Sequence, residues 1–348
     1  MEIIWSHVSS PSGYRDGVYS VCVSSGIVYA VGFDELMGYG KQRYRVEGVD
    51  ARDGHMIAKW VDDKAHSFAS LYSCTAVGDR IYVFGATDRF WTIMVFDKLL
   101  NPVKRVDREK PYILPFSVVN VGRYIYVAGV EITPTGSTAI HVSRISVDDL
   151  SIVNSYTSNP KDRGAGAYSI AYNKKMKQII VGGFDKIDGV SNWRIEYLTE
   201  DLNLIKISRP SVKGSITGLA LDADGFIYTA GRTRIARISR EGETLNTVTS
   251  PQAVKIYTSQ ESLPILGTNI AVATDNEAYI LTNDTLSIVE AIRLSRGPQI
   301  LSMMLGSMDA DNERIYLAST QIATKDDWNW TILALKPRGR GFLRLFRR

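Results

Sequence analysis

A short apolar motif recurs seven times along this chain of 348 residues, and this repeat constrains the fold more than any other feature. The motif is an apolar residue, often followed by Tyr, then two small or apolar residues and often Gly. Its copies are VYAVG, IYVFG, IYVAG, IIVGG, IYTAG, IAVAT and IYLAS, beginning at Val28, Ile81, Ile125, Ile179, Ile227, Ile270 and Ile315. Successive copies start 43 to 54 residues apart. This period is typical of architectures that repeat one supersecondary unit.

Each unit has the pattern of four short strands. An apolar run such as YSVCVSS precedes the motif, and a polar turn such as Gly78-Asp79 or Asp224-Gly225 joins the two. Such pairs suit tight hairpins because they tolerate positive φ. Two further strand-like runs follow the motif, and no helical period appears. The sequence therefore predicts an all-β fold, a seven-bladed β-propeller of four-stranded blades.

The expected propeller occupies residues 1–336. Its blades are predicted near residues 15–63, 70–108, 113–158, 166–210, 214–250, 253–295 and 299–336. The seventh unit lacks a fourth strand, but EIIWSHVS at 2–9 matches the other fourth strands. We expect this N-terminal strand to close the last blade, because a shared blade removes free sheet edges. The alternative is that GFLRLFRR at 341–348 supplies the closing strand.

The segment 337–348, PRGRGFLRLFRR, differs from the rest in composition and is predicted to be a basic C-terminal tail. The chain has 41 basic and 37 acidic residues, so without the five tail arginines the body is nearly neutral. The tail residues singled out for partner binding are Arg338, Arg340, Phe342, Arg344, Phe346, Arg347 and Arg348. Arginines bind phosphates, and Phe stacks on bases or enters a membrane interface or a partner's groove. RNA, an anionic membrane and a protein are therefore alternative partners, and a solvated terminus is the simpler interpretation.

Composition favours an ordinary globular protein, with 45% hydrophobic and 22% charged residues. No apolar run approaches the roughly 18 residues of a membrane span. The first residues include Glu2 and no long apolar core, so a signal peptide is not expected and the protein is predicted to be cytoplasmic. The four histidines lack metal-motif spacing, and neither a metal nor a cofactor is expected. Cys22 and Cys74 are interpreted as buried thiols, with a disulfide as the alternative.

Two segments resemble known propeller families. VDARDGHMIAKW at 49–60 resembles the strand–turn–strand repeat of quinoprotein-like propellers, and LDADGFIYTAG at 221–231 resembles the turn of NHL and lactonase-type propellers. No unit carries a WD pair with its Gly-His partner or the full kelch signature. The resemblance implies the propeller architecture. It implies no quinoprotein activity, because those enzymes usually have eight blades and a dedicated cofactor site.

The candidate partner face comes from the loops between the second and third strands, which are long in the first, third, fourth and seventh units. GFD opens two of these loops, so Asp34 and Asp185 are expected to face one surface. Long loops on a rigid ring often carry function, and aromatic residues often anchor interfaces. The candidate anchors are Tyr39, Trp193, Trp328 and Trp330. The alternatives are that each Asp caps a solvated turn and that each Trp packs a blade.

A hydroxyl recurs near the start of each innermost strand, at Ser20, Ser73, Ser117, Ser169, Thr217, Thr258 and Ser302. We expect these hydroxyls to form hydrogen bonds between blades, with a polar ligand in the channel as the alternative. Acidic residues gather in two turns on the face opposite the long loops, at Asp222, Asp224, Asp309 and Asp311. The innermost strands have few acids and no histidine, which argues against an enzyme without deciding the matter.

The leading interpretation is a non-enzymatic cytoplasmic scaffold that binds a protein or a macromolecular complex through one loop face and the Arg-rich tail. A second interpretation is an RNA- or ribosome-associated factor anchored by the tail. A third is a small-molecule hydrolase or lactonase with a site at the channel mouth. The sequence does not indicate an oligomeric state.

Overall fold

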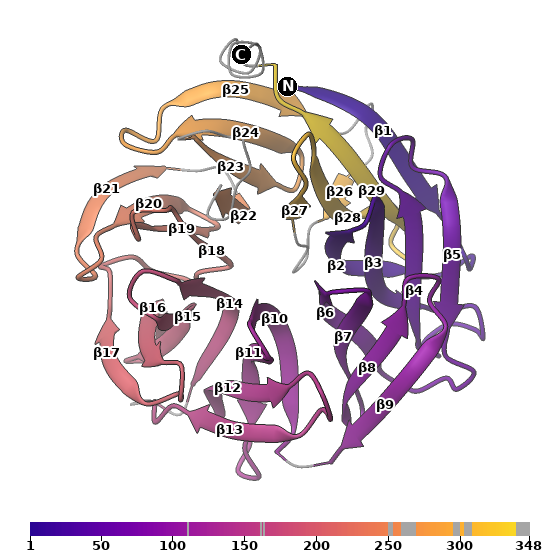
Figure 1. Ribbon diagram of the computed structural model, residues 1–348, viewed down its shortest axis with the longest axis horizontal. Coiled ribbons are helices and arrows are strands. Elements are labelled where there is room, and N and C mark those ends of the chain that lie inside the picture. Colours follow the sequence, from indigo (N-terminus) through magenta and orange to yellow (C-terminus); the bar gives the residue numbers. More distant parts are fainter. Residues whose placement is uncertain are drawn as a thin grey trace.

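The chain folds into a ring of seven antiparallel sheets (Figure 1). The structure is a computed structural model that describes residues 1–109, 111–160, 162, 164–249, 253–258, 269–294, 300–302 and 308–338, with backbone alone at 253–258 and 300–302. These residues form 29 strands and no helix, so the predicted all-β propeller with seven blades is confirmed. No helix long and apolar enough to cross a membrane occurs among them.

The first four blades follow one another along the chain, and each has its four strands in sequence order. Blade 1 contains β2 (Gly17–Ser24), β3 (Ile27–Asp34), β4 (Arg43–Asp50) and β5 (Met56–Val61), and blade 2 contains β6 (Ala69–Val77), β7 (Arg80–Thr87), β8 (Trp91–Asp97) and β9 (Pro102–Arg108). Blade 3 contains β10 (Ile113–Val121), β11 (Tyr124–Ile132), β12 (Thr138–Ser146) and β13 (Ile152–Thr157), and blade 4 contains β14 (Ala165–Asn173), β15 (Gln178–Ile187), β16 (Val190–Thr199) and β17 (Leu204–Ser208).

The last three blades complete the ring. Blade 5 contains β18 (Gly218–Leu221), β19 (Ile227–Gly231), β20 (Arg234–Ile238) and β21 (Thr244–Thr249), and blade 6 contains β22 (Ala253–Thr258), β23 (Asn269–Thr274), β24 (Glu277–Thr282) and β25 (Ile288–Arg293). Blade 7 contains β26 (Ile300–Ser302) and β27 (Met308–Ala310), which both pair with β28 (Ile315–Thr324), then β29 (Asp327–Lys336) and β1 (Glu2–Ser9). We call the four strands of a blade a to d, from the channel outward.

The N-terminal strand closes the ring, as the sequence predicts. β1 runs antiparallel to β29, with register from Glu2 opposite Lys336 to Ser9 opposite Trp330. The same strand is tied to blade 1, because Ser9 Oγ donates to Glu47 Oε1 at 2.7 Å and His7 Nε2 lies 3.1 Å from Glu47 Oε2. The position beside β29 is thus occupied, which excludes the alternative that segment 341–348 fills it.

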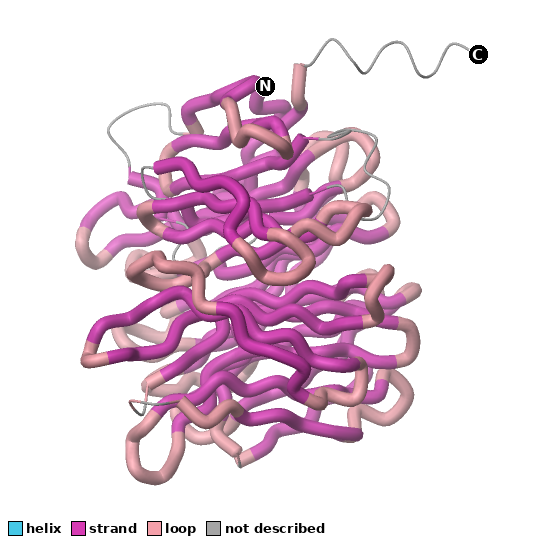
Figure 2. Tube along the Cα trace, turned by 90° about the vertical axis from the view of Figure 1, so that its left-hand side faces the viewer, coloured by secondary structure: helices cyan, strands magenta, loops and turns pink. Residues whose placement is uncertain are grey.

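The hydrophobic core consists of clusters that join neighbouring blades. One cluster combines Trp5, Ala51 and Val28 with Tyr316 and Trp330, so it connects blade 7 to blade 1. The second and third strands, such as β3, β7 and β8, are buried at nearly every position, because both faces of each sheet pack against neighbouring blades. The connections between strands gather at the two ends of the ring (Figure 2).

The recurring glycine of the sequence motif has a structural reason. In blade 4, the pairing of β14 with β15 shifts by one residue between Ala167 and Ser169, which is a β-bulge opposite Gly183. The bulge brings the β14 carbonyl so close that a Cβ on Gly183 would lie 1.9 Å from the oxygen of Gly166. The glycines at 32, 85, 129 and 231 also face a carbonyl oxygen of their innermost strand or of the residues just before it, at 1.9–2.5 Å.

We expect Gly183→Ala to destabilise the protein by about 1–3 kcal/mol, because the inner strand must move away from the new methyl group. Urea unfolding followed by circular dichroism measures this loss. The matched control is Gly48→Ala on β4, where the nearest atom to a new Cβ is Ile27 Cγ2 at 3.4 Å, an ordinary contact. Equal unfolding free energies for the two variants would contradict the account of the motif.

Candidate partner-binding face

One end of the ring carries the b–c hairpins and the d–a connections, and we call it the b–c face. Among the b–c hairpins, which the structure describes in all seven blades, blade 1 has the longest irregular loop, residues 35–42, and blade 3 has a loop over residues 133–137. In blades 4 and 7 the residues expected as long loops instead extend the strands. β15 and β16 turn over residues 188–189, and β28 and β29 turn over residues 325–326. The predicted long loops of blades 4 and 7 are therefore hairpins whose strands project beyond the blade. Their solvent-exposed strand ends are polar, as a loop would be, so the sequence pattern did not separate the two.

The two Asp residues of the GFD motifs do not face solvent. Asp34 and Asp185 are fully buried. Asp34 Oδ1 accepts from Arg43 Nε at 3.0 Å, and Asp34 Oδ2 lies 3.3 Å from Arg45 Nη1. Asp185 Oδ2 lies 2.9 Å from Arg194 Nη1 and 2.9 Å from Arg209 Nε. The expectation of two carboxylates on one surface is corrected: both belong to buried ion pairs.

The ion pairs follow one pattern in two blades. In each, an Arg on strand c lies between the Asp of strand b and a Glu two residues further along strand c. Arg45 Nε donates to Glu47 at 2.8 Å, and Arg194 Nε donates to Glu196 at 2.8 Å. In blade 3, His141 takes the place of the Arg, 2.9 Å from Glu131 and 2.8 Å from Ser143.

The two buried glutamates differ in their titration. Burial raises the pKa of Glu196, and the Arg194 charge offsets this rise only in part. Burial also opposes ionisation of Glu47, but the hydrogen bond from His7 and the charge of Arg45 outweigh it and leave the pKa of Glu47 below its ordinary value. These groups serve the junctions between strands and blades, which is the structural alternative to a partner site.

The three tryptophans among the four candidate aromatic anchors differ in burial. Trp193 and Trp330 are buried, and Trp330 Nε1 donates to the carbonyl of Phe33 in blade 1 at 3.0 Å. Trp193 packs against Gly231 of blade 5. These two residues therefore pack between blades, and we remove them from the candidate site. Trp328 lies two residues nearer the hairpin tip and is only half-buried.

Trp328 and Tyr39 form an exposed group with residues that the sequence reasoning missed. We call this group the aromatic patch; it consists of Tyr14, Arg15, Leu36, Met37, Tyr39 and Trp328. Tyr39, Leu36 and Met37 are more than half exposed. The Arg15 guanidinium lies 4.5 Å from the centre of the Tyr39 ring and 5.6 Å from that of Trp328. Tyr14 meets Tyr39 edge-on, with 6.1 Å between ring centres.

The backbone under the aromatic patch is firmly held. The Trp328 amide donates to the carbonyl of Tyr14 at 3.0 Å, and the Asp16 amide donates to Trp328 at 3.1 Å. Asp16 is buried and accepts from Ser12 Oγ at 2.8 Å and from the Glu35 amide at 3.1 Å. Burial raises the pKa of Asp16, against these hydrogen bonds. The patch therefore presents exposed rings on a fixed base.

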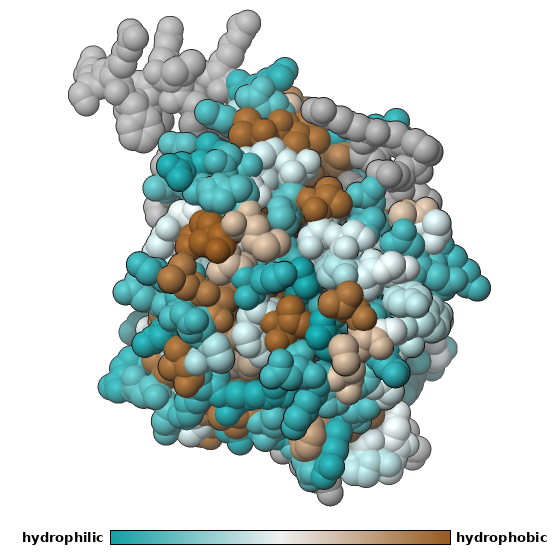
Figure 3. All heavy atoms as spheres, turned by 90° about the vertical axis from the view of Figure 1, so that its right-hand side faces the viewer, coloured by the Kyte–Doolittle hydropathy of each residue, from teal (hydrophilic) through white to brown (hydrophobic). Residues whose placement is uncertain are grey.

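Among the described residues, the outer wall of the ring has no exposed aromatic group of this kind. Its exposed apolar residues lie on d strands, among them Val8, Ile57 and Val103. On the wall formed by blades 1 and 2, apolar side chains are scattered between hydrophilic ones (Figure 3). Isolated exposed apolar residues are normal on soluble proteins, whereas clustered aromatic side chains mark interaction sites.

The central channel contains a cavity of about 460 Å³ lined by innermost strands of six blades. The expected hydrogen bonds between blades are present for four of the hydroxyls, at Ser20, Ser73, Ser117 and Ser169. Ser73 Oγ donates to the Pro115 carbonyl at 2.9 Å, Ser117 Oγ accepts from the Ile170 amide at 3.3 Å, and Ser169 Oγ accepts from the Leu219 amide at 2.9 Å. Ser20 contacts Cys74 Sγ at 3.8 Å, and Thr217 bonds within blade 5. The side chains of Thr258 and Ser302 lie outside the described residues.

An arc of aromatic rings runs across the inner strands of blades 1 to 4. Ring centres of Tyr19 and Tyr72 are 4.9 Å apart, those of Tyr72 and Phe116 are 5.0 Å apart, and those of Phe116 and Tyr168 are 5.3 Å apart. Each ring precedes one of the channel serines and lies at a bulge, which redirects the side chain toward its neighbour. The repeated aromatic–Ser pair was visible in the sequence but was interpreted only through its serine.

Cys22 and Cys74 are free and buried in the channel wall. Burial, together with the neighbouring Cys74, raises the pKa of the Cys22 thiol. A thiol held in its neutral form is a poor nucleophile and a poor metal ligand. The prediction of two buried thiols is confirmed, and the two cysteines do not form a disulfide.

Asp222, Asp224 and Asp311 lie in turns on the opposite face, whereas Asp309, also expected in a turn, lies on β27 and lines the central cavity. Asp222 Oδ1 accepts from the amides of Asp224 and Phe226, each at 3.0 Å, and Asp311 Oδ2 accepts from the Tyr316 hydroxyl at 2.6 Å. Asp309 Oδ2 accepts from the Val23 amide across the blade junction at 2.8 Å. Asp222 and Asp311 thus stabilise turns, and Asp309 stabilises a blade junction.

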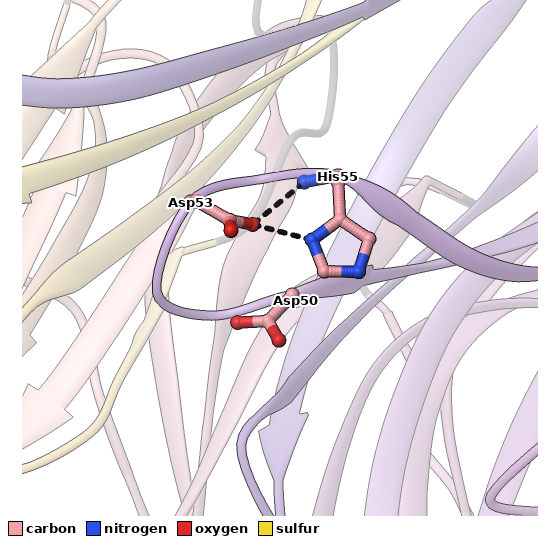
Figure 4. A group of neighbouring side chains, drawn as sticks. All are labelled: Asp50, Asp53 and His55. Atoms are coloured by element: carbon pink, nitrogen blue, oxygen red, sulfur yellow. Dashed lines mark hydrogen bonds and ion pairs between the residues drawn. The ribbon is translucent and has the colours of Figure 1, made fainter.

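Within the described part of the chain, one group has the composition of a metal site: Asp50, Asp53 and His55 in the β4–β5 turn (Figure 4). Asp50 already pairs with Arg52 Nη2 at 2.7 Å, and His55 Nδ1 lies 2.6 Å from Asp53 Oδ1. The hydrogen bonds from Arg52 lower the pKa of Asp50 to about 2. Asp53 and His55 are exposed whereas Asp50 is buried, and both carboxylates have hydrogen-bond partners within the turn.

Most of the tail residues singled out in the sequence, Arg340, Phe342, Arg344, Phe346, Arg347 and Arg348, lie outside the described residues. Arg338 is described: its Nη2 lies 3.0 Å from Glu2 Oε2, and its amide donates to Glu290 Oε2 at 3.0 Å. Because Glu2 begins β1 where β29 ends, the tail starts at the face opposite the aromatic patch.

No protein-family model matches the sequence, and no curated protein is similar to it in sequence. Solved structures are similar in fold. The WD40 domain of Pan2 from Neurospora crassa superimposes with a TM-score of 0.64 at 11% identity, covering 97% of this chain and 96% of that chain. Sqt1 from Chaetomium thermophilum gives a TM-score of 0.60 at 12% identity, covering 96% and 99% of the two chains.

A second Sqt1 structure, bound to the N-terminus of the ribosomal protein L10, is similar with a TM-score of 0.58 at 12% identity and covers the same shares. At these identities the similarity shows the fold alone. The chain is therefore a propeller with WD40-type structural neighbours, and its own residues must carry any statement about function.

Proposed function

We propose that this propeller is a non-enzymatic cytoplasmic scaffold that binds a protein partner through the aromatic patch on its b–c face. The observation that carries the proposal is the pair of exposed rings, Tyr14 and Tyr39, which lie with the half-buried Trp328 around the Arg15 guanidinium. Tyr, Trp and Arg are the residue types that dominate binding energy at protein interfaces. Leu36 and Met37 add apolar area beside them.

The neighbouring structures support this class of function. Sqt1 is bound to the N-terminus of a ribosomal protein, so a propeller of similar fold binds a protein segment. For this chain we propose only the same class of function, binding of a protein segment. The chemistry of the patch fits an apolar or aromatic segment with a carboxylate or carbonyl facing Arg15. The similarity of segment 49–60 to quinoprotein-like repeats and of 221–231 to NHL repeats is retained as a proposal about lineage.

The test uses two exposed methionines on opposite faces. A photo-crosslinking amino acid replaces Met37 in the aromatic patch or Met176 in the β14–β15 turn; these side chains are 53% and 50% exposed. In native lysate we expect a discrete protein adduct from position 37 and not from position 176. Tyr39→Ala in the position-37 protein should abolish most of the adduct, since loss of a central aromatic residue typically costs about 2 kcal/mol, or about 30-fold in Kd.

Adducts of equal yield from both positions, or an adduct at position 37 that survives Tyr39→Ala, would exclude the patch as the docking site. The same lysates examined with a chain that ends at Pro337 and with nuclease separate the alternative, an RNA- or ribosome-associated factor. That alternative requires that association be lost with the tail and with nuclease, and weakened by salt. The hydrolase alternative has no observation in its favour among the described residues.

A further inference from the structure

The b–c face has a second feature, far from the aromatic patch, in the form of a cationic pocket between blades 4 and 5. Its lining residues are Ser211, Val212, Lys213, Thr233, Arg234 and Thr249, and its volume is about 310 Å³. Its lining residues follow β17 or belong to β20, β21 and the β19–β20 turn, and these strands lie across the ring from β28 and β29 (Figure 1). It is separate from the proposed docking site and does not depend on that proposal.

The pocket forms because the b–c hairpin of blade 4 is longer than that of blade 5. In blade 4, β15 and β16 have ten residues each, whereas β19 and β20 in blade 5 have five each. The segment that connects the two blades lies along the taller hairpin, since the Trp193 amide donates to Val212 at 2.9 Å and the Gly214 amide donates to Ser191 at 2.8 Å. Lys213 and the short turn at Arg232-Thr233 therefore border one hollow.

The polar lining is made of cations and hydroxyl groups, without a carboxylate. Arg234 Nη1 donates to Thr249 Oγ1 at 2.6 Å, which fixes its guanidinium at the rim. Neither Lys213 nor Arg234 pairs with an acid in the described residues, and Asp185 nearby is buried and already held by Arg194 and Arg209. Ser211 and Thr233 supply two further hydroxyl donors.

The wider surroundings carry the same sign of charge. The elements around the pocket are the β15–β16 tip, the connection after β17 and the β19–β20 turn. On this face they contain four cations toward blade 5, Arg209, Lys213, Arg232 and Arg234, and two acids, Asp185 and Asp188, while Lys186 lies against Gly164 on the side of blade 3. A net positive surface with unpaired cations and hydroxyl donors attracts an anion with several acceptor oxygens.

We infer that this cationic pocket binds a phosphate monoester group. Its two negative charges match Lys213 and Arg234, and its oxygens accept from the guanidinium fork, the ammonium and the hydroxyls of Ser211 and Thr233. A water molecule takes about 30 Å³, so the pocket, at about 310 Å³, has room for several groups of that size. The pocket thus also holds the first atoms of the molecule that carries the phosphate, either a phosphorylated protein side chain or a small metabolite.

The test is calorimetric titration of the full-length protein at low salt with inorganic phosphate, phenyl phosphate, and a phosphoserine peptide beside its unphosphorylated form. The variant is Lys213→Gln with Arg234→Gln. The control is Lys174→Gln with Lys175→Gln, which removes the same charge from an exposed turn on the opposite face. We expect phosphate binding to be about tenfold weaker in the variant and unchanged in the control. Added salt should weaken binding by the wild type.

Tighter binding of the phosphoserine peptide than of phenyl phosphate would assign the site to a phosphorylated protein, and the reverse order would assign it to a small metabolite. Either order supports the site. Equal phosphate affinity in the variant and the wild type would overturn the inference, as would no detectable binding at about 10 mM phosphate. Both variants change exposed side chains, and their thermal unfolding confirms that each is folded before titration.

Discussion

A chain that begins at Ser10 is expected to lose the closed ring and to aggregate instead of remaining monomeric. The deletion removes β1, and with it the whole outer strand of blade 7. Trp5 is 8% exposed in the structure. Burial of one Trp side chain corresponds to about 4–6 kcal/mol, from an area of roughly 150–250 Å². That is a large share of the 5–15 kcal/mol that typically separates folded from unfolded domains.

The deletion also removes the contacts that fasten blade 7 to blade 1. Glu47 loses its bonds to Ser9 and His7, and the carbonyl of Ala51 loses the Trp5 indole, which donates to it at 3.0 Å. The newly exposed edge of β29 presents unpaired backbone groups, which promote association between chains. Size-exclusion chromatography with light scattering, together with thermal unfolding, measures both effects.

Two further chains act as controls. A chain that ends at Arg338 should unfold at the wild-type temperature, because it keeps β1, β29 and the Arg338–Glu2 pair. A circular permutant should fold, with residues 11–336 joined by a short turn to residues 2–10. Lys336 lies opposite Glu2, so the new turn replaces an ordinary c–d turn. A stable monomer without residues 1–9, or an unfolded chain without 339–348, would contradict the closure.

The strand arrangement could be predicted because each blade repeats the same local signals. Motifs such as IYVAG mark second strands, and pairs such as Asp224-Gly225 mark turns, so the position of every blade follows from neighbouring residues. The match of EIIWSHVS to a fourth strand even located the closure. These features depend on contacts within one blade or on the simple requirement that a ring has no free edge.

The surface could be predicted only in part, because it depends on register between strands. Asp34 looked like a loop residue, but Arg45 lies opposite Gly32 on the next strand, within reach of its carboxylate. Trp328 and Trp330 point to the same side of β29, and only the greater distance of Trp328 from the blade body leaves it exposed. Single-strand patterns contain neither the register nor the length of a hairpin.

The aromatic patch and the cationic pocket required the assembled ring. Tyr14 and Trp328 are more than 300 residues apart in sequence, and the backbone pairing of their segments brings them together. Lys213 and Arg234 belong to different blades and become neighbours because one hairpin is shorter than the next. In the sequence, the aromatic patch is indicated only by an apolar pair, Leu36-Met37, inside a polar loop. The cationic pocket is indicated only by cations without nearby acids. Neither signal identifies a site before the fold is known.

Arg194→Met is expected to destabilise the protein by about 3–5 kcal/mol at pH 7, the typical loss when one partner of a buried ion pair is removed. Arg194 is 2% exposed and lies between Asp185 and Glu196, which are both fully buried. Asp185 retains Arg209 at 2.9 Å in the variant, whereas Glu196 loses its only direct Arg contact. Urea unfolding of the variant and the wild type gives the difference.

The pH dependence identifies the charge as the cause. Burial already raises the pKa of Glu196 above its ordinary value of 4.5, and loss of Arg194 raises it further. Between the unfolded and folded pKa values, the folded variant binds a proton that the unfolded chain does not bind. Its stability therefore increases as the pH falls from 7 toward 5, and its deficit relative to the wild type shrinks.

Arg123→Met is the matched control, since Arg123 and its partner Asp148 are both mostly exposed. This change should cost less than about 1 kcal/mol, with little dependence on pH. A deficit for Arg194→Met that stays constant from pH 7 to pH 5 would mean that lost packing of the long side chain, rather than an uncompensated carboxylate, explains the instability. A deficit no larger than that of the control would show that the buried Asp–Arg–Glu pattern of blades 1 and 4 contributes little to holding the ring together.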